Sequence, residues 1–107
     1  MSVSVTIIED SRIAKLAARK LGSNTMAITI GHKIYLHNVS RNAFLKNTSW
    51  LCHELKHVEQ FRRYGFVPFI FKYLWESLLK GYYNNKWEVE ARNAEGDFGL
   101  LIEFEVI

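Results

Sequence analysis

The sequence lacks most of the features that mark secreted, fibrous or membrane-spanning proteins. It has one cysteine, Cys52, so no disulfide can form within the chain and nothing favours an oxidising compartment. With 1 proline and 6 glycines among 107 residues, it does not have the composition of a collagen-like or disordered protein. The longest uninterrupted apolar run covers residues 66–71, whereas a transmembrane helix needs about 20 apolar residues. The first ten residues also lack a signal-peptide pattern, so we expect a cytoplasmic protein without integral membrane association.

A strong excess of charge is also missing. The net charge is +3, and the basic residues are scattered apart from the pair Arg62 and Arg63. Nucleic-acid-binding proteins gather basic residues on one surface, so we expect no nucleic-acid partner. The remaining composition, 49% hydrophobic and 23% charged, is that of a globular protein. A chain of this length has room for a single domain, over residues 1–107.

The first part of the chain predicts a sheet with one helix. Residues 2–8 are rich in β-branched side chains and predict a strand. Asp10 or Ser11 can cap a helix that ends at Leu21, before Gly22. Two further runs of strand composition, 25–30 and 33–37, are separated by two residues that include a glycine, which is a hairpin pattern.

The second part of the chain is predicted to be mainly helical. Apolar residues at helical spacing and glycine stops predict helices over 42–64, 67–80 and 87–95, the last beginning near Asn84 or Asn85. The tail, 98–107, alternates apolar and acidic residues as a strand does. This order of elements favours an α+β domain over a doubly wound one.

The segment 66–83 is unusually rich in aromatic residues. In so short a chain we expect these side chains to pack in the core. A dimer interface or a membrane-surface helix is the alternative.

One motif in the strongest predicted helix points to metal chemistry. Residues 53–57 read His-Glu-Leu-Lys-His, and residues four apart lie on the same face of a helix. His53 and His57 can therefore direct ring nitrogens at one Zn²⁺ ion. Glu54 lies about 100° around the helix from His53, where it can reach a water molecule instead of the metal. The alternative is that these are ordinary surface side chains.

A catalytic zinc site usually has three protein ligands, so two histidines leave it incomplete. Position 63 is Arg63, which excludes the metzincin pattern with a third histidine six residues after His57. The third ligand is then one of the upstream residues His32 and His37, or a carboxylate. The acidic helix 87–95 can supply a carboxylate if the chain turns back on itself.

The residues around the motif resemble a known class of zinc peptidases. The segments 52–65 and 82–91 are similar to the H-E-L-x-H-V-x-Q core and the downstream acidic element of gluzincins. The small bacterial DUF4157-like peptidases and the minigluzincins are the nearest in pattern, and the similarity covers about residues 25–95. The resemblance implies a zincin-like domain that hydrolyses peptide or protein substrates with one Zn²⁺ ion, in an active or a latent form.

The resemblance also implies roles for individual residues. His53 and His57 would be zinc ligands, and Glu54 would be the catalytic general base. Glu88 would be the third ligand, with Glu90 in reserve. The two differ by about 200° around a helix, so only one can face the metal.

The pattern departs from the family at two positions, one of which is Lys86, where the family element often has proline. Related enzymes often carry an aspartate four residues after the ligand glutamate, where it orients a metal-binding histidine, but this chain has Arg92. Glu90, Glu95 or Asp97 is then needed for that bond.

Substrate contacts are less defined by the sequence. The candidates for a donor to the reaction's oxyanion are Tyr82, Tyr83, His32 and His37. The strand 33–37 could pair with an extended peptide. The tail 98–107 could cover the cleft with Glu103 or Glu105, or add a strand to the sheet.

Two other functions are compatible with the sequence. One is a zinc-binding domain without turnover that acts as a peptide- or protein-interaction module. The other is a metal-free interaction module in which the motif is a relic.

Overall fold

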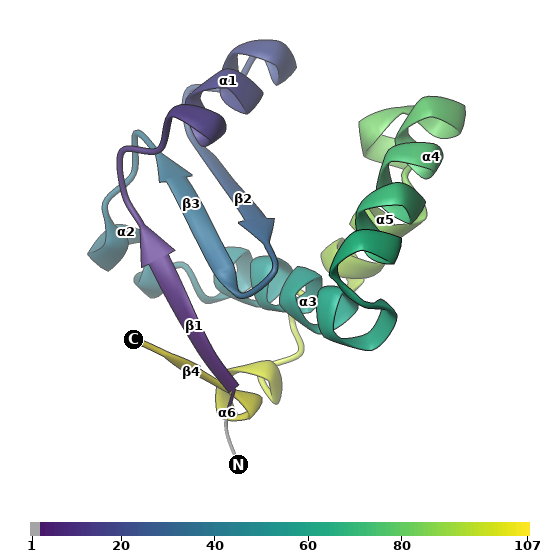
Figure 1. The fold of residues 1–107 in the computed structure, drawn as a ribbon. Coiled ribbons are helices and arrows are strands. Elements are labelled where there is room, and N and C mark those ends of the chain that lie inside the picture. Colours follow the sequence, from purple (N-terminus) through teal and green to yellow (C-terminus); the bar gives the residue numbers. More distant parts are fainter. Residues whose placement is uncertain (1–2) are drawn as a thin grey trace.

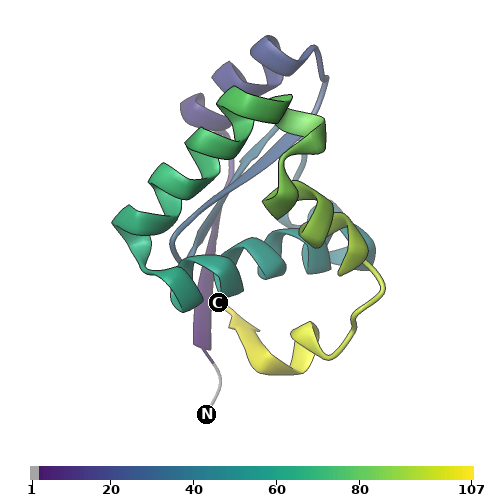
Figure 2. The same cartoon turned by 90° about the vertical axis from the view of Figure 1, so that its right-hand side faces the viewer.

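The fold places a mixed four-stranded sheet beside a group of helices, in a computed structural model that describes residues 3–107 (Figures 1 and 2). The sheet has the order β2-β3-β1-β4. β2 and β3 form an antiparallel hairpin, whereas β1 runs parallel to both β3 and β4. Gly31 has a positive φ of 65° in the hairpin turn, a conformation that favours glycine. The predicted α+β class is confirmed.

Most elements begin and end near their predicted positions. In chain order the elements are β1 (Val3–Ile8), α1 (Arg12–Leu21), β2 (Met26–Ile30), β3 (Lys33–His37), α2 (Arg41–Lys46), α3 (Thr48–Tyr64), α4 (Phe66–Asn84), α5 (Lys86–Asn93), α6 (Leu100–Glu103) and β4 (Phe104–Val106).

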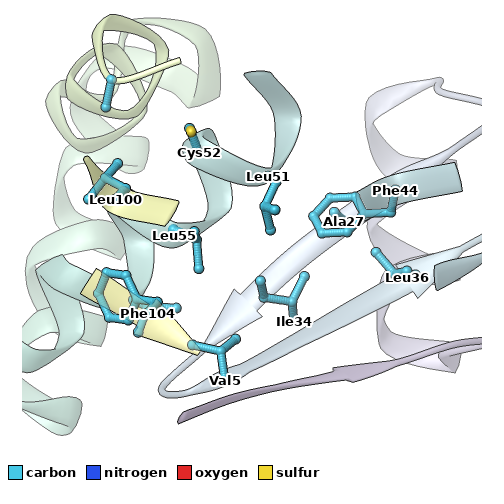
Figure 3. Close-up of a cluster of buried hydrophobic side chains, with 12 residues drawn as sticks. Val5, Ala27, Ile34, Leu36, Phe44, Leu51, Cys52, Leu55, Leu100 and Phe104 are labelled. Atoms are coloured by element: carbon cyan, nitrogen blue, oxygen red, sulfur yellow. The ribbon is translucent and has the colours of Figure 1, made fainter. Parts of the chain in front are cut away.

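The main core forms where α3 packs against the sheet. Figure 3 shows Leu51 and Leu55 projecting from α3 toward Ile34 and Val5 on the strands. Leu55, Ile34 and Val5 have no exposed surface, and the burial of each such aliphatic side chain stabilises the fold by about 1.5–3 kcal/mol. This packing fixes the orientation of α3, so the opposite face of the helix is presented to α5.

Asn47 divides the helix predicted over 42–64 into two. Its N–H donates to the Phe44 carbonyl at the end of α2, and its side-chain oxygen accepts from the Trp50 N–H at the start of α3. Apolar periodicity continues across this junction, which is why the sequence pattern predicted one helix.

The tail differs from the prediction of one strand over 98–107. Residues 100–103 form a short helix, α6, and only 104–106 form a strand. β4 pairs with β1 at the edge opposite β2, so the tail adds to the sheet and does not cover the cleft beside α3. Phe104 is buried in the main core, which explains why the tail turns toward the sheet.

The free edge of the sheet beside the helices is β2, not the strand 33–37 that was predicted to pair with a peptide. β3 has β2 on one side and β1 on the other, so its hydrogen-bonding groups are already used. Figure 1 shows β2 on the side of the sheet that faces α4 and α5.

α4 corrects the prediction that the aromatic segment packs in the core. Phe69 is buried, but Phe71, Trp75 and Leu78 are more than half exposed. Gly81, with φ 79°, interrupts the helix, which continues to Asn84 after the kink. No helix within residues 3–107 is both long and apolar enough to cross a membrane.

Candidate metal centre

Three side chains with metal-binding atoms meet between α3 and α5. His53 and His57 lie one turn apart on α3, and Glu88 faces them from α5. His53 Nε2 lies 3.0 Å from Glu88 Oε1, and His57 Nε2 lies 3.2 Å from Glu88 Oε2. One candidate ligand atom from each residue lies within 4.8 Å of the other two.

The position of Glu88 depends on the buried side chain of Asn85 at the start of α5. Asn85 Oδ1 accepts from the Trp87 N–H, which caps the helix. Asn85 Nδ2 donates to the Tyr73 carbonyl and to Ser77 Oγ, so the same side chain ties α5 to α4. Asn85 has no exposed surface, and these bonds hold the first turn of α5, with Glu88, over α3.

Each histidine ring is oriented by a second partner at Nδ1. His53 Nδ1 lies 2.8 Å from Glu95 Oε2, and a carboxylate can only accept, so Nδ1 carries the hydrogen. His57 Nδ1 lies 2.8 Å from Gln60 Oε1. The Gln60 amide nitrogen donates to the Trp87 carbonyl and to Glu90, which leaves its oxygen for His57. Such outer partners fix the tautomer of metal-binding histidines.

This network fits a cation between the two rings and Glu88. With hydrogen on both Nδ1 atoms, a neutral His53 and a neutral His57 each direct an Nε2 lone pair toward a carboxylate, which is repulsive. A proton on Nε2 or a metal ion removes the conflict. Tetrahedral zinc places its ligand atoms about 3.3 Å apart, close to the two Nε2–carboxylate distances. The donor set of two imidazoles and a carboxylate is one that zinc uses in catalytic sites.

The ionisation of the site follows from burial and from the close charges. Burial alone would lower the pKa of His57, but the hydrogen bond and charge of Glu88 raise it to about 9. Burial alone would raise the pKa of Glu88, yet the bonds from His53, His57 and Tyr73 hold it well below its usual range. Without metal, a proton on His57 therefore balances the Glu88 carboxylate at neutral pH.

Glu54 lies beside the histidines and is almost completely buried. The Thr29 hydroxyl on β2 donates to Glu54 Oε1 at 2.8 Å, and its distance to the Glu54 carbonyl is 3.3 Å. Burial raises the pKa of Glu54 above its usual value, although His57, His53 and Thr29 act in the opposite direction. A buried carboxylate with a raised pKa beside a candidate metal site is suited to accept and return a proton.

A tyrosine that was not predicted contacts the site. The Tyr73 hydroxyl donates to Glu88 Oε2 at 2.6 Å. Burial and the neighbouring Glu88 raise the pKa of Tyr73, so it stays protonated as a donor. Of the four predicted oxyanion donors, Tyr82 and Tyr83 line a cavity with Glu88, and His32 and His37 line neither cavity described next.

Two cavities flank the candidate centre along β2. A cavity of about 270 Å³ beside His57 and Glu88 is lined mainly by apolar side chains. Its apolar lining residues are Ile28, Ile30, Phe61, Phe69, Ile70 and Leu74. A larger and more polar cavity, about 500 Å³, lies beside His53 and Glu54 and includes Glu95. The centre is thus accessible from both sides along the free edge of the sheet.

The remaining predicted residues take other positions. Glu90 accepts from the Gln60 amide, and Arg92 donates to the Tyr83 carbonyl. Of the acids proposed to replace the missing aspartate, Glu95 makes the bond to His53. Gln60 was missed, although its position three residues after His57 places it on the same helix face. Thr29 and Tyr73 have no such local signal, because they lie on other elements.

Comparison with protein families gives a match over more than half of the chain. The family model described as the eCIS core domain matches residues 3–65, from β1 to just beyond α3, and so includes His53, Glu54 and His57. Comparison with curated proteins and with solved structures gives no match.

Proposed function

Because the chain belongs to the eCIS core domain family, we propose that it is a zinc-dependent metalloendopeptidase of the gluzincin type. This family is related to the DUF4157 family, which is linked to peptidase-like proteins. The observation that carries the proposal is the pair of Nε2 atoms that face Glu88, each on a ring held at Nδ1 by an acceptor, beside the buried Glu54.

In this proposal His53, His57 and Glu88 hold one Zn²⁺ ion. When bound, zinc would polarise the scissile carbonyl and lower the pKa of a water molecule. Glu54 takes a proton from the attacking water and later gives it to the leaving amine. The Thr29 hydroxyl occupies Oε1 of Glu54, so Oε2 is the atom that exchanges the proton.

The chain's own surface would position the peptide. A substrate in extended form would pair with the free edge of β2, which takes the place of the strand 33–37 in the sequence-based prediction. Its side chains would enter the two cavities that flank the centre. Tyr82 and Tyr83 are the candidate donors to a developing oxyanion, since both line the cavity that includes Glu88. The one hydrogen of the Tyr73 hydroxyl, by contrast, is donated to Glu88.

The test compares zinc content and peptide hydrolysis in the same preparations. The wild-type protein should bind about one zinc ion and cleave an unfolded protein substrate, with activity lost on chelation and restored by zinc. Glu54→Gln should keep the zinc and lose at least about 100-fold in kcat, because the proton acceptor is removed. Glu59→Gln is the matched control, because Glu59 lies on the same helix and, within residues 3–107, its side chain bonds to Lys56 alone.

Each outcome separates the alternatives. Zinc binding without hydrolysis in the wild type would indicate an interaction module that uses zinc for structure. If zinc uptake survives Glu88→Ala but is lost in Glu90→Ala, the third ligand is Glu90 and the assignment of Glu88 is wrong. A wild type that takes up no zinc even when supplied would overturn the proposal.

A further inference from the structure

One outward-facing stripe of α4, between residues 67 and 78, is apolar. Val67, Phe71, Leu74, Trp75 and Leu78 are each between 58% and 78% exposed. Their spacing of four, seven, eight and eleven positions from Val67 places them on one face of the helix. We refer to these five residues as the outer face of α4; Leu74, at its edge, also lines the apolar cavity beside His57.

The outer face of α4 is exposed because other side chains of the helix, Phe69 and Tyr73, make its contacts with the rest of the protein. Phe69 packs with Phe61 and Trp87 in a second apolar cluster, and Tyr73 turns toward Glu88. Figures 1 and 2 show α4 as an outer element with the rest of the molecule on one side of it. Five neighbouring large apolar side chains in solvent are unusual on a monomer and mark an interaction surface.

A basic border runs along one side of this face. Lys72 and Arg63 both lie over the ring of Tyr64, with their charged atoms 5.8 and 5.7 Å from its centroid. On α5, Lys86 lies over the Trp87 ring at 4.7 Å. Trp75 of the outer face lines one groove with Lys72 and Lys86, so the apolar and basic surfaces are continuous.

The one acidic side chain on α4, Glu76, lines the same groove, but its charge is balanced by Lys80, a cation that is not part of the border. Glu76 is buried, accepts from the Lys86 N–H and lies 3.2 Å from Lys80 Nζ. The border therefore presents cations to a partner. A second copy of the chain would bring the same cations together, so the charge pattern favours an anionic partner over self-association.

We propose that the outer face of α4 binds the surface of an anionic lipid bilayer. An interfacial helix inserts an apolar face at the headgroup boundary and keeps cations beside it, as α4 does. Trp75 and Phe71 supply aromatic rings of the kind enriched at that depth. Lys72, Arg63 and Lys86 would contact anionic headgroups along one side. The helix would lie in the plane of the surface, with the cleft beside β2 open to one side.

Vesicle binding tests this directly, and Trp75 is a built-in probe. With the full chain, vesicles of phosphatidylcholine containing phosphatidylglycerol should shift the tryptophan emission to the blue and carry the protein down on sedimentation. Vesicles of phosphatidylcholine alone should bind at least about tenfold more weakly. Chelation of zinc should leave binding unchanged, so the result does not depend on the proposed peptidase activity.

Two variants with matched controls locate the contact. Leu78→Ser should weaken partitioning by about tenfold or more, whereas Leu16→Ser should not, although Leu16 on α1 is 65% exposed. Lys72→Gln should weaken it about fivefold, whereas Lys20→Gln changes the net charge equally and should have little effect. All four positions are exposed, so the variants should fold.

Three results would overturn the proposal. One is equal binding to charged and neutral vesicles. Another is equal loss of binding in Lys72→Gln and Lys20→Gln, since that would mean attraction by net charge alone, or in Leu78→Ser and Leu16→Ser, since that would not locate the contact on α4. The third is a dimer in solution that Leu78→Ser dissociates while vesicles fail to bind, which would assign the outer face to a second copy of the chain.

Discussion

Replacing Gln60 with leucine should weaken zinc binding strongly while leaving every proposed ligand in place. Gln60 is 1% exposed and accepts from His57 Nδ1 at 2.8 Å. Leucine has a similar volume but offers no acceptor. The His57 ring would lose the partner that fixes its tautomer, and the Trp87 carbonyl would lose its donor from Gln60.

The expected loss of zinc affinity follows from the hydrogen bond between His57 Nδ1 and Gln60 Oε1 and from the burial of that bond. Loss of such a partner lowers metal affinity by about 10- to 100-fold. The Trp87 carbonyl left without its side-chain donor should also lower the free energy of unfolding by about 1–3 kcal/mol. Glu95, which bonds His53 in the equivalent way, has a side chain 41% exposed, so water can replace it. Glu95→Leu, which likewise removes the acceptor, should therefore cost less than Gln60→Leu.

Competition with a fluorescent zinc chelator measures the affinities, and urea unfolding of the metal-free proteins measures stability. Gln60→Glu is the informative control, because a carboxylate restores an acceptor for Nδ1. The reasoning is refuted if Gln60→Leu binds zinc within twofold of the wild type. It is also refuted if Glu95→Leu has the larger effect, since burial would then not decide the contribution.

Three further predictions test separate parts of the structure. His57 has a pKa of about 9, so zinc must displace its proton in order to bind at neutral pH. The apparent zinc affinity should therefore rise about tenfold per pH unit from pH 7 and level off above about pH 9. Calorimetry in buffers of different ionisation enthalpy would measure the released proton. Thr29→Val removes the hydroxyl that donates to Glu54 and should lower kcat about tenfold with an unchanged zinc-to-protein ratio, and unchanged kcat would contradict that positioning role. Leu55→Ala should lower the free energy of unfolding by about 2–5 kcal/mol in urea, whereas the exposed Leu16→Ala should change it little.

Local signals in the sequence were enough to predict most elements. Ser11 accepts from the Ala14 N–H at the start of α1, and Gly22 ends that helix with a positive φ of 68°. These are caps that depend only on neighbouring residues. The spacing of His53 and His57 is local in the same sense, since an α-helix brings them to one face wherever it lies in the fold.

Long-range pairing is where the sequence was not sufficient. The residues of β2 (26–30) and β3 (33–37) do not by themselves indicate which of the two strands lies at the edge of the sheet, because that depends on the pairing of β1 with β3. The contacts of Thr29 with Glu54 and of Tyr73 with Glu88 join residues 25 and 15 positions apart on different elements. Only the packed structure brings such groups together.

The apolar residues of α4 show a different limit. Composition reports that a segment is apolar, and the usual consequence is burial in the core. Here the positions of Phe71 and Leu78 on the helix turn them away from the core, because Phe69 and Tyr73 occupy the inward side. The sequence predicts that α4 has an apolar face, but it does not predict whether that face points toward the core or toward solvent.

The pairing of β1 with β4 has a consequence for the order of folding. Val3 and Phe104, paired in register, are about one hundred positions apart, so the contact closes a loop of nearly the whole chain. The entropy of that closure is recovered only after the intervening elements have condensed, which makes the pair a late step. Until then the edge of β1 is open, and during synthesis it stays open while the helices emerge from the ribosome. A chain interrupted before Phe104 would keep its hairpin and its α3 helix but display an unpaired strand to its neighbours.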